Sequence, residues 1–270
     1  MKNLKNDILL FPLVLLLMTN PRVVSGQPAF TLIQSLETRA GLVTADHLGQ
    51  IYLLEGSRLS CLDSNLVFKA AFSDNKDGVY AGSDVSDPLK ILLFSREFGR
   101  IRFIDQNLAP RGSAVDLAAL QYPNASLCCS SYESGFWIYD PASLQVVRFN
   151  SRAQEVLYSG NLAALAGTDV QACFMTEISN MLYLADSLRG IFIFDRYGAF
   201  LKQLPVPGII QICSSGEMII FIGRELIFVY DAAKAELNEL PLPCKAVSAC
   251  ITNRKLYLLS GTHLHVYGIL

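Results

Sequence analysis

The sequence has little of several features that would indicate a particular chemistry. It contains only three histidines, and the motifs H-E-x-x-H, G-x-S-x-G and C-x-x-C are absent, as is a glycine-rich phosphate loop. Charge is nearly balanced, with 22 basic against 24 acidic residues and a formal net charge of -2. No polybasic run would hold a membrane surface, and we expect no nucleic-acid partner. The sequence predicts no catalytic residue, no metal site and no cofactor.

Long apolar segments are also missing beyond the N-terminus. After residue 26 no stretch reaches 18 uninterrupted apolar residues, so we expect no transmembrane segment in the mature chain. Residues 1–26 differ in kind: two lysines precede an apolar run over residues 8–18, and small residues lie before Gln27. This is the layout of a signal peptide, which predicts an exported, periplasmic or envelope-associated product spanning residues 27–270. An uncleaved N-terminal anchor is the alternative.

The mature chain does contain a sixfold repeat. Each copy is an apolar strand, a short polar turn and a second apolar strand, and all copies but the last end in an acidic or amide residue. The fourth copy is the clearest, with residues 181–186 followed by residues 191–195. The copies end at positions 63, 105, 150, 195, 231 and 267, at intervals of 36 to 45 residues. This spacing is typical of one four-stranded blade of a β-propeller.

The remaining strands and the chain ends complete the pattern. A further apolar strand precedes each pair, another follows most pairs, and no amphipathic helix of ten or more residues is evident after residue 26. The sixth copy stops after its third strand, whereas residues 30–36 form a strand without a repeat of its own. We therefore predict one all-β domain, a six-bladed propeller with four-stranded antiparallel blades, in which the N-terminal strand completes the last blade and closes the ring.

Two segments carry a resemblance to known repeats. "NMLYLADSLRGIFIFDRYGAFLKQLP" and "GFWIYDPASLQVVRFNSRAQEVLYSG" resemble blades of the NHL and TolB-like six-bladed propellers. Arg58 and Arg100, each five residues before an aspartate, match the arginine that commonly opens the third strand of an NHL repeat. The corresponding positions in later copies hold Gln145, Gly190 and Leu226. The resemblance covers about residues 28–270, extends to secreted bacterial propeller proteins, and implies an architecture without fixing an activity.

The candidate site lies on the face formed by the turns between second and third strands. Basic side chains gather there with some carboxylates between them, which predicts a basic rim that binds an anionic ligand or an acidic segment of a partner. Alternatively, each arginine pairs with a carboxylate of a neighbouring blade or hydrates a turn, and such exposed pairs contribute ~0–1 kcal/mol. The candidate residues are Arg58, Arg96, Arg100, Asp140, Asp186, Arg189, Arg224 and His263.

Three other features have two interpretations each. His263 and His265 point to the same side of one strand, but we expect His47 on the opposite loop face, which argues against a three-histidine metal site. Trp137 lies inside an apolar strand, where core packing is favoured over a ligand platform. The link over residues 161–169 is unusually long and is either an ordinary insertion or a functional loop.

The cysteines are odd in number and are not spaced as in a small disulfide scaffold. Most lie within apolar strands, so we expect small buried core residues, although a thiolate site lining the channel is conceivable. Equivalent positions in adjacent blades lie farther apart than the ~7 Å Cα limit for a disulfide. The cysteines are Cys61, Cys128, Cys129, Cys173, Cys213, Cys244 and Cys250.

The function predicted from these observations is that of a binding module. We expect an exported, monomeric, non-enzymatic scaffold for another envelope or secreted protein, because a propeller offers broad loop faces and no catalytic constellation is visible. A metal-dependent, lactonase-like propeller hydrolase is the first alternative, and a sensor of a small anionic ligand is the second.

Overall fold

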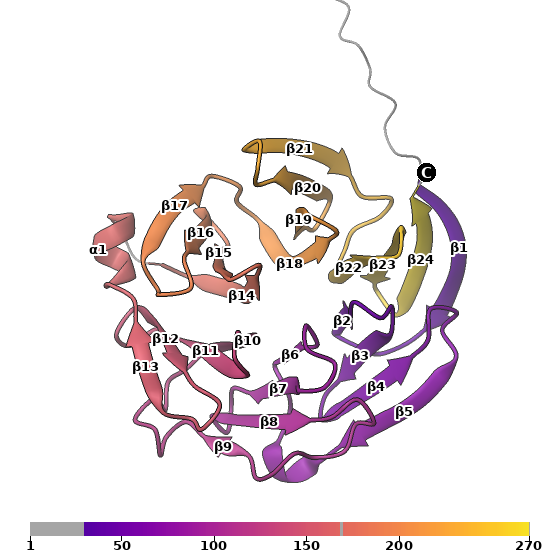
Figure 1. Cartoon of the computed structure of the whole chain (residues 1–270). Helices are drawn as coiled ribbons and strands as arrows, with labels where there is room; N and C mark the ends of the chain where they lie inside the picture. Colours follow the sequence, from indigo (N-terminus) through magenta and orange to yellow (C-terminus); the bar gives the residue numbers. More distant parts are fainter. Residues whose placement is uncertain (1–29, 168–169, 270) are drawn as a thin grey trace, which may run out of the picture.

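The computed structural model describes residues 30–167 and 170–269, so the predicted signal peptide lies outside the described residues. Within these ranges the strands form six separate four-stranded antiparallel sheets. The sheets are arranged as blades around a central axis (Figure 1). The chain is therefore a six-bladed β-propeller, as the repeat predicts.

Each blade runs from an innermost strand at the axis to an outermost strand at the periphery. Blade 1 is β2 (Leu42–Ala45), β3 (Ile51–Glu55), β4 (Arg58–Leu62) and β5 (Phe68–Ser73), and blade 2 is β6 (Gly82–Asp84), β7 (Ile91–Ser95), β8 (Arg100–Ile104) and β9 (Val115–Asp116). Blade 3 is β10 (Leu127–Ser131), β11 (Gly135–Asp140), β12 (Gln145–Phe149) and β13 (Glu155–Tyr158), and blade 4 is β14 (Ala172–Ile178), β15 (Met181–Asp186), β16 (Gly190–Phe194) and β17 (Phe200–Leu204). Blade 5 is β18 (Ile209–Ser215), β19 (Met218–Gly223), β20 (Leu226–Asp231) and β21 (Glu236–Pro241), and blade 6 is β22 (Ser248–Thr252), β23 (Lys255–Ser260), β24 (His263–Ile269) and β1 (Phe30–Glu37).

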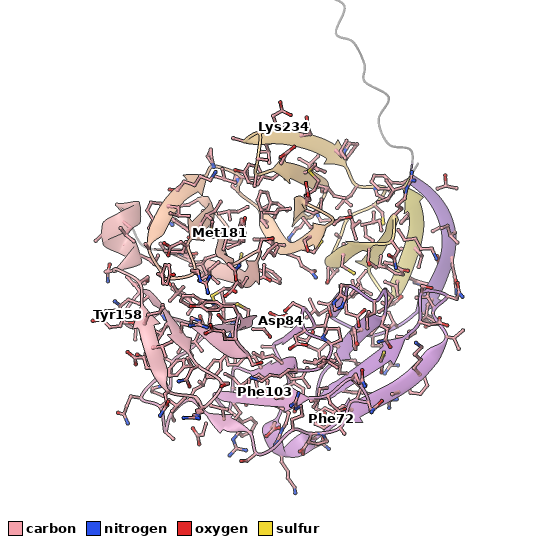
Figure 2. All side chains as sticks on the ribbon, viewed as in Figure 1. Phe72, Asp84, Phe103, Tyr158, Met181 and Lys234 are labelled. Carbon is pink, nitrogen blue, oxygen red and sulfur yellow. The ribbon has the colours of Figure 1, made fainter. Side chains whose placement is uncertain are left out.

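The core consists of six apolar clusters, each lying between two neighbouring blades. Between blades 3 and 4, for example, Trp137, Leu184 and Phe192 are fully buried. A strand in the middle of a blade contacts such clusters on both faces, so all five residues of β16 are buried. Outer strands face solvent: five of the six residues of β21 are exposed, and Tyr158 of β13 lies at the periphery while Asp84 lies near the axis (Figure 2). Burial on both faces explains why the middle strands read as nearly continuous apolar runs.

The ring is closed by the N-terminal strand, which confirms the prediction. β1 pairs antiparallel with β24, in a register that runs from Phe30 opposite Ile269 to Glu37 opposite His263 (Figure 1). Leu36 packs into the cluster between blades 6 and 1. This pairing gives blade 6 its outer strand and covers the edge of β24 that would otherwise be exposed.

The acidic or amide residues that end the repeats form the turns between third and fourth strands. In blades 1 to 4 the side chain accepts two backbone N–H groups, two and four residues further on, at 2.8–3.0 Å. These residues are Asp63, Asp105, Asn150 and Asp195. The residue three positions further on has a positive φ each time: 61° at Leu66, 60° at Leu108, 57° at Ala153 and 75° at Gly198. The repeat seen in the sequence therefore reflects a hairpin turn of the same kind that recurs in successive blades.

Two connections depart from the regular pattern. The outer strand of blade 2, β9, has only two residues, and an isolated bridge between Ile104 and Pro110 precedes it. The long link between blades 3 and 4 contains a short helix, α1 (Leu162–Ala166). The side chain of Asn161 accepts a hydrogen bond from the N–H of Ala164, and Leu162 is buried in the core. The insertion is therefore anchored to the propeller by its first turn, and the five residues of α1 agree with the prediction of no amphipathic helix of ten or more residues.

Candidate functional site

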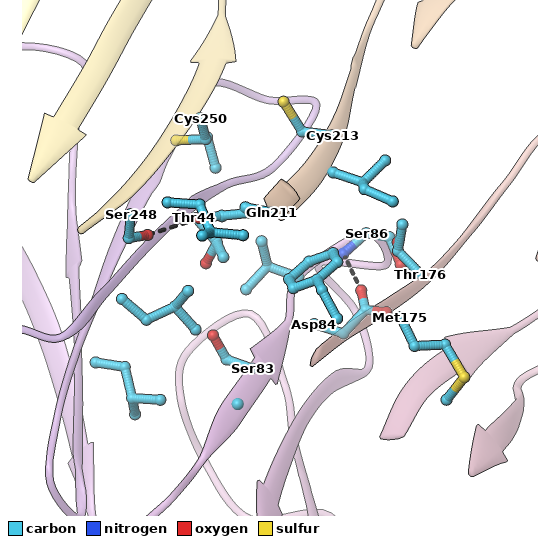
Figure 3. A pocket seen from close by; sticks show the side chains of 18 of the residues that line it. Thr44, Ser83, Asp84, Ser86, Met175, Thr176, Gln211, Cys213, Ser248 and Cys250 are labelled. Atoms are coloured by element: carbon cyan, nitrogen blue, oxygen red, sulfur yellow. Dashed lines mark hydrogen bonds between the residues drawn. The ribbon is translucent and has the colours of Figure 1, made fainter. Parts of the chain in front are cut away.

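The innermost strands of the six blades surround a central channel with a volume of about 920 Å³. Hydroxyl, amide and thiol groups dominate the labelled part of its wall, with the carboxylate of Asp84 among them (Figure 3). The hydroxyl oxygens of Thr44 and Ser83 are buried and have no hydrogen-bond partner among the described residues. Apolar side chains such as Leu42, Phe174 and Ile212 line the channel as well, so its wall mixes uncharged polar and apolar groups with few charges.

A buried amide ties three blades together at this wall. Gln211 of β18 donates from Nε2 to the carbonyl oxygen of Val43 in β2, at 2.9 Å. Its Oε1 accepts hydrogen bonds from the Ser248 hydroxyl at 2.7 Å and from the N–H of Ala249 at 3.1 Å. Ser248 in turn accepts from the N–H of Val43, at 2.9 Å. Because both ends of the amide are satisfied, Gln211 links blades 5, 6 and 1 where the chain ends meet.

The channel thiols are arranged as protonated groups. Cys173, Cys213 and Cys250 line the channel from three successive blades, and all the cysteines are free. Burial raises the pKa of Cys213 to about 11, and burial followed by the nearby Cys213 raises the pKa of Cys250. A thiol with a raised pKa is a poor nucleophile and a poor metal ligand at neutral pH. Cys250 is a buried core residue as predicted, whereas Cys173 is exposed.

All eight candidate residues belong to the turns between second and third strands or to the strand ends beside them. They therefore share one face of the ring. We call this the rim face; it also includes the links that enter each innermost strand. Of the eight, Arg96 alone contributes to the channel lining. The others lie at the turns of individual blades. The structure therefore places all eight on one face but does not gather them into one site.

The two candidate aspartates cap their own turns. Asp140 is 6% exposed and accepts hydrogen bonds from the N–H and the hydroxyl of Ser143, at 3.1 and 2.7 Å. Asp186 is fully buried and accepts from the N–H groups of Leu188 and Arg189, at 2.8 and 2.9 Å. Its Oδ2 also lies 3.5 Å from Nη1 of Arg189. These carboxylates are committed to the backbone beneath the rim face.

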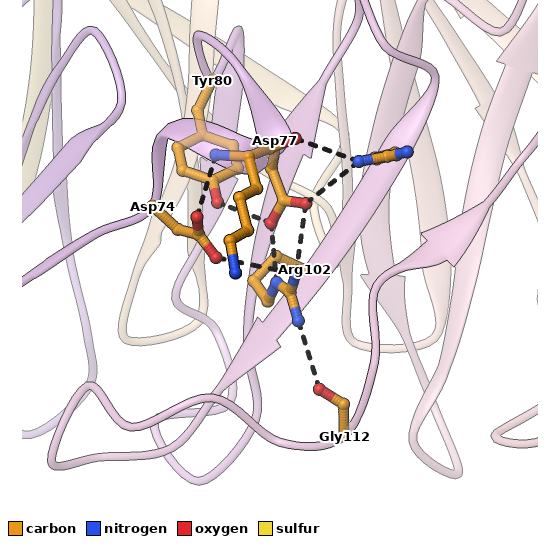
Figure 4. Close-up of polar contacts among 7 residues, drawn as sticks. Asp74, Asp77, Tyr80, Arg102 and Gly112 are labelled. Carbon is orange, nitrogen blue, oxygen red and sulfur yellow. Dashed lines mark hydrogen bonds and ion pairs between the residues drawn. The ribbon is translucent and has the colours of Figure 1, made fainter.

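Arg100 borders a polar cluster that lies between blades 1 and 2, in which Asp77, Tyr80 and Arg102 point toward one another (Figure 4). The centre of that cluster is Asp77, whose side chain is 1% exposed; Arg102 donates to its two oxygens from Nε at 2.7 Å and Nη2 at 3.1 Å. Tyr80 donates to it at 3.1 Å, and Arg100 lies 3.8 Å away. Burial alone would raise the pKa of Asp77, but hydrogen bonds from Arg102 and Tyr80 and the two arginine charges lower it on balance. Sequence reasoning missed this cluster because Asp77 and Arg102 are 25 positions apart.

The remaining candidates are exposed on the rim face. Arg58 donates from Nε to the Ser60 hydroxyl at 3.2 Å, and Arg96 donates from Nε to the carbonyl oxygen of Ser126 at 2.8 Å. Arg224 and His263 are exposed as well. Four large apolar side chains lie on the same face with about half or more of their surface exposed: Val79 (56%), Phe98 (51%), Leu188 (67%) and Val247 (56%). Sequence reasoning did not select these, because single apolar residues in polar turns have no periodicity.

The histidines do not form a common site. His47 lies in the turn between β2 and β3, on the opposite face from His263. The rings of His263 and His265 are stacked with centroids 5.9 Å apart. Over residues 30–167 and 170–269, no group of three or more His, Cys, Asp or Glu side chains is placed to hold a metal ion. In the same ranges no helix is long and apolar enough to cross a membrane.

Trp137 is a core residue, as expected. It is fully buried, and its Nε1 donates to Oε2 of Glu177 at 2.6 Å. The same carboxylate accepts from the hydroxyl of Ser131 at 2.7 Å and from the N–H of Tyr132 at 3.0 Å. Glu177, which also lies in the channel lining, therefore ties blade 4 to blade 3.

Comparison with known proteins identifies the fold and no family. No protein-family model matches the sequence, and no curated protein matches it. Among solved structures, an inactive variant of virginiamycin B lyase from Staphylococcus aureus, solved with quinupristin, is 11% identical, with a TM-score of 0.66 over 90% of this chain and 100% of the other. A chain of the mitotic checkpoint complex is 9% identical, with a TM-score of 0.65 over 98% and 99%.

A third similar structure is BamB from Moraxella catarrhalis, at 12% identity and a TM-score of 0.50 over 89% of this chain and 98% of that one. Such low identities establish the propeller fold alone. Because the similar structures include both a lyase and a member of a multiprotein complex, the fold does not specify the function.

Proposed function

We propose that this chain is exported after removal of residues 1–26 and acts as a non-enzymatic binding module of the NHL/TolB-like type. Its ligand is another protein of the cell envelope, which it holds on the rim face. The observation that carries the proposal is the interleaving of exposed apolar and arginine side chains on that face.

The composition of the rim face supports a protein partner. Aromatic residues and arginine are enriched in protein interfaces, where a few such anchors supply most of the binding free energy. Phe98 and Leu188 are exposed large apolar side chains on turns held by capped or paired residues. Arg96 and Arg224 stand exposed on turns of the same face. Together they supply anchors of both kinds on a rigid scaffold.

The charge of the rim face also favours a folded partner over a small anion. Glu55, Glu97 and Glu225 are exposed on the same turns as the arginines. Glu225 lies 3.7 Å from the amine of Lys245. Carboxylates among the cations weaken attraction for a small anion, whereas a partner with a matching pattern of charges gains specificity from it.

The proposal is tested by purifying the tagged mature chain from its native envelope after crosslinking. We expect a partner in stoichiometric amount with the wild type and its loss with the double variant Phe98→Asp and Leu188→Asp. The matched control is Tyr197→Asp, because Tyr197 is 67% exposed on the opposite face. Recovery of no partner from an abundant, folded protein, or equal loss with the control, contradicts the proposal. Retention of residues 1–26 on the envelope-associated protein contradicts its export by cleavage.

A further inference from the structure

A second concave site lies on the face opposite the rim face, between blades 2 and 3. It is a cleft of about 780 Å³, a size suited to a small organic molecule. Its walls come from the turn before β7, the loop that follows β8 and the two turns of blade 3 on that face. Most of the wall therefore belongs to the loops of one face, with Phe103 of β8 and Val115 of β9 beside them, and no candidate residue of the rim face takes part.

Three cations line this cleft, against one carboxylate. Lys90, Arg111 and Arg152 supply the positive charges, and Asp87 is the acidic residue in the lining. Asp87 is already engaged by its own turn, since its Oδ1 accepts from the N–H of Leu89 at 3.0 Å. The cleft thus has a local excess of positive charge in a protein whose formal net charge is -2.

The cations have few anionic partners in the folded chain. Lys90 donates to the carbonyl oxygen of Ser134, and its amine lies 4.0 Å from the centre of the Phe103 ring. Arg111 donates from Nη1 to the carbonyl oxygen of Leu89, at 2.6 Å. Carbonyl oxygens and an aromatic ring orient a cation but do not neutralise it. Among the described residues no carboxylate forms an ion pair with Lys90, Arg111 or Arg152.

Lys90 is affected both by its burial and by the neighbouring charge of Arg111. Burial lowers the pKa of Lys90, and the charge of Arg111 lowers it further, with only partial opposition from Asp87. An anion bound between Lys90 and Arg111 would offset their mutual repulsion and favour the protonated form of Lys90. Beside the cations, the side chain of Leu89 is 59% exposed and offers an apolar surface, whereas the Phe103 ring is buried beneath Lys90.

We propose that this cleft binds a phosphorylated small molecule or headgroup, with its phosphate held by Lys90, Arg111 and Arg152 and its adjoining apolar portion lying on Leu89. Lysine acts as a point charge toward phosphate, and the arginine forks donate paired hydrogen bonds to its oxygens. Serine hydroxyls at positions 113, 134 and 151 lie in the same lining and supply further donors. The site is independent of the proposed protein-binding function, because it occupies the other face.

The test measures binding of two probes to the purified mature chain at constant ionic strength. Inorganic pyrophosphate represents a free phosphate compound, and phosphatidylcholine vesicles with and without phosphatidic acid represent a membrane headgroup. Lys90→Met keeps the alkyl stem over Phe103 while removing the charge, and Arg152→Gln removes the exposed arginine. The matched control is Arg254→Gln, an exposed arginine on the same face but in blade 6. Thermal unfolding of each variant establishes that it is folded.

We expect saturable binding of pyrophosphate or of the acidic vesicles by the wild type. Each of the two cleft variants should raise the dissociation constant on the order of tenfold, as loss of a charged hydrogen bond does, while the control leaves it unchanged. Binding of pyrophosphate identifies a free phosphate compound as the ligand, and binding of vesicles alone identifies a headgroup. Binding of neither probe, or binding that the Lys90 and Arg152 variants leave intact, overturns the proposal.

Discussion

Individual residues at the hairpin turns between third and fourth strands affect the stability of each blade through their backbone conformation. Ala153 and Gly198 occupy the same position in the turns of blades 3 and 4, and both have positive φ. A left-handed conformation costs a residue with a Cβ ~1–2 kcal/mol, whereas glycine adopts it freely. The equivalent position thus holds a residue that is strained by the left-handed conformation in blade 3 and one that tolerates it in blade 4.

Exchanging these two residues should have opposite effects. We expect Ala153→Gly to raise the free energy of unfolding by roughly 0.5–1 kcal/mol, after allowance for the greater entropy of glycine in the unfolded chain. Gly198→Ala should lower it by ~1–2 kcal/mol, because its Cβ would also approach Leu157 to 3.1 Å. Urea denaturation measures both. Changes of the same sign in the two variants would contradict this account of the turns.

The buried carboxylate of Asp77 predicts a particular dependence of stability on pH. Its pKa is lowered in the folded protein, so on acidification the unfolded chain binds the proton first. The stabilisation is present above the unfolded value of ~4 and is lost as the pH falls through the lower folded value. Asp77→Asn leaves Arg102 with only the more distant carboxylate of Asp74, 3.9 Å away, and should reduce stability by about 3 kcal/mol at neutral pH. Denaturant titrations should show the wild-type advantage shrinking below about pH 4; an advantage that is constant from neutral to strongly acidic pH would exclude the role of Asp77.

The roles of some of these residues could be predicted from the sequence better than those of others. Asp140 and Asp186 were predicted to bind a ligand or partner; they lie in turns of the rim face, and their hydrogen bonds to backbone N–H groups two and three positions on show a capping role. Local turn chemistry could have indicated this, because aspartate commonly bonds the backbone just ahead of it. The pairing of Asp77, in the link between blades 1 and 2, with Arg102 of blade 2 has no local signal. Whether the exposed arginines bind a partner stays a prediction.

At the scale of strands, the closing strand β1 should be essential to the last blade. Leu36 is partly buried in the cluster between blades 6 and 1, whereas Leu32 of the same strand is 54% exposed. We expect Leu36→Asp to lower stability by about 2–4 kcal/mol, because it buries an unpaired charge, and to promote association through the uncovered edge of β24. Leu32→Asp is the matched control and should change stability by under about 0.5 kcal/mol.

Thermal unfolding and size-exclusion chromatography distinguish the two outcomes. Equal stability and an equally monomeric state for the Leu36 and Leu32 variants would contradict a structural role for the closing strand. A destabilised, associating Leu36 variant beside an unaffected control would support it.

The strands that the sequence predicted best are those buried on both faces. The pairs at the middle of each blade were predicted in all six copies, because packing on two sides makes them apolar throughout. The outermost strand of blade 2 was not predicted: β9 has two residues and is paired only with the start of β8. Likewise, α1 was not predicted, since its five residues are too few to show a helical period.

At the scale of the molecule, the propeller carries two separate surfaces. The rim face presents apolar and arginine side chains, and the opposite face carries the cationic cleft between blades 2 and 3. The channel between them is held by polar links such as that of Gln211 across blades 5, 6 and 1. A rigid ring with its recognition groups on loops can therefore engage a protein on one face while its other face remains open to a ligand.

The contribution of the Gln211 hydrogen bonds to the stability of the closed ring can be tested by substitution. Gln211→Ala would leave the Val43 carbonyl, the Ser248 hydroxyl and the Ala249 N–H without this partner in a buried setting. We expect a loss of about 1–3 kcal/mol for each polar group that remains unsatisfied, seen as a lower midpoint in urea. Gln203→Ala, which removes one exposed side-chain hydrogen bond, is the control and should have a small effect. Equal midpoints for the two variants would contradict the role of Gln211 in closing the ring.

The central claim, that the rim face holds a protein partner, is tested most directly by placing a photocrosslinking amino acid at single positions in cells that export the chain. The account predicts a crosslinked partner of one defined mass from position 98 and from position 188, and none from position 197 on the opposite face. Crosslinks from position 197 with none from positions 98 and 188, or no crosslink from any of the three in a folded and abundant protein, would contradict it.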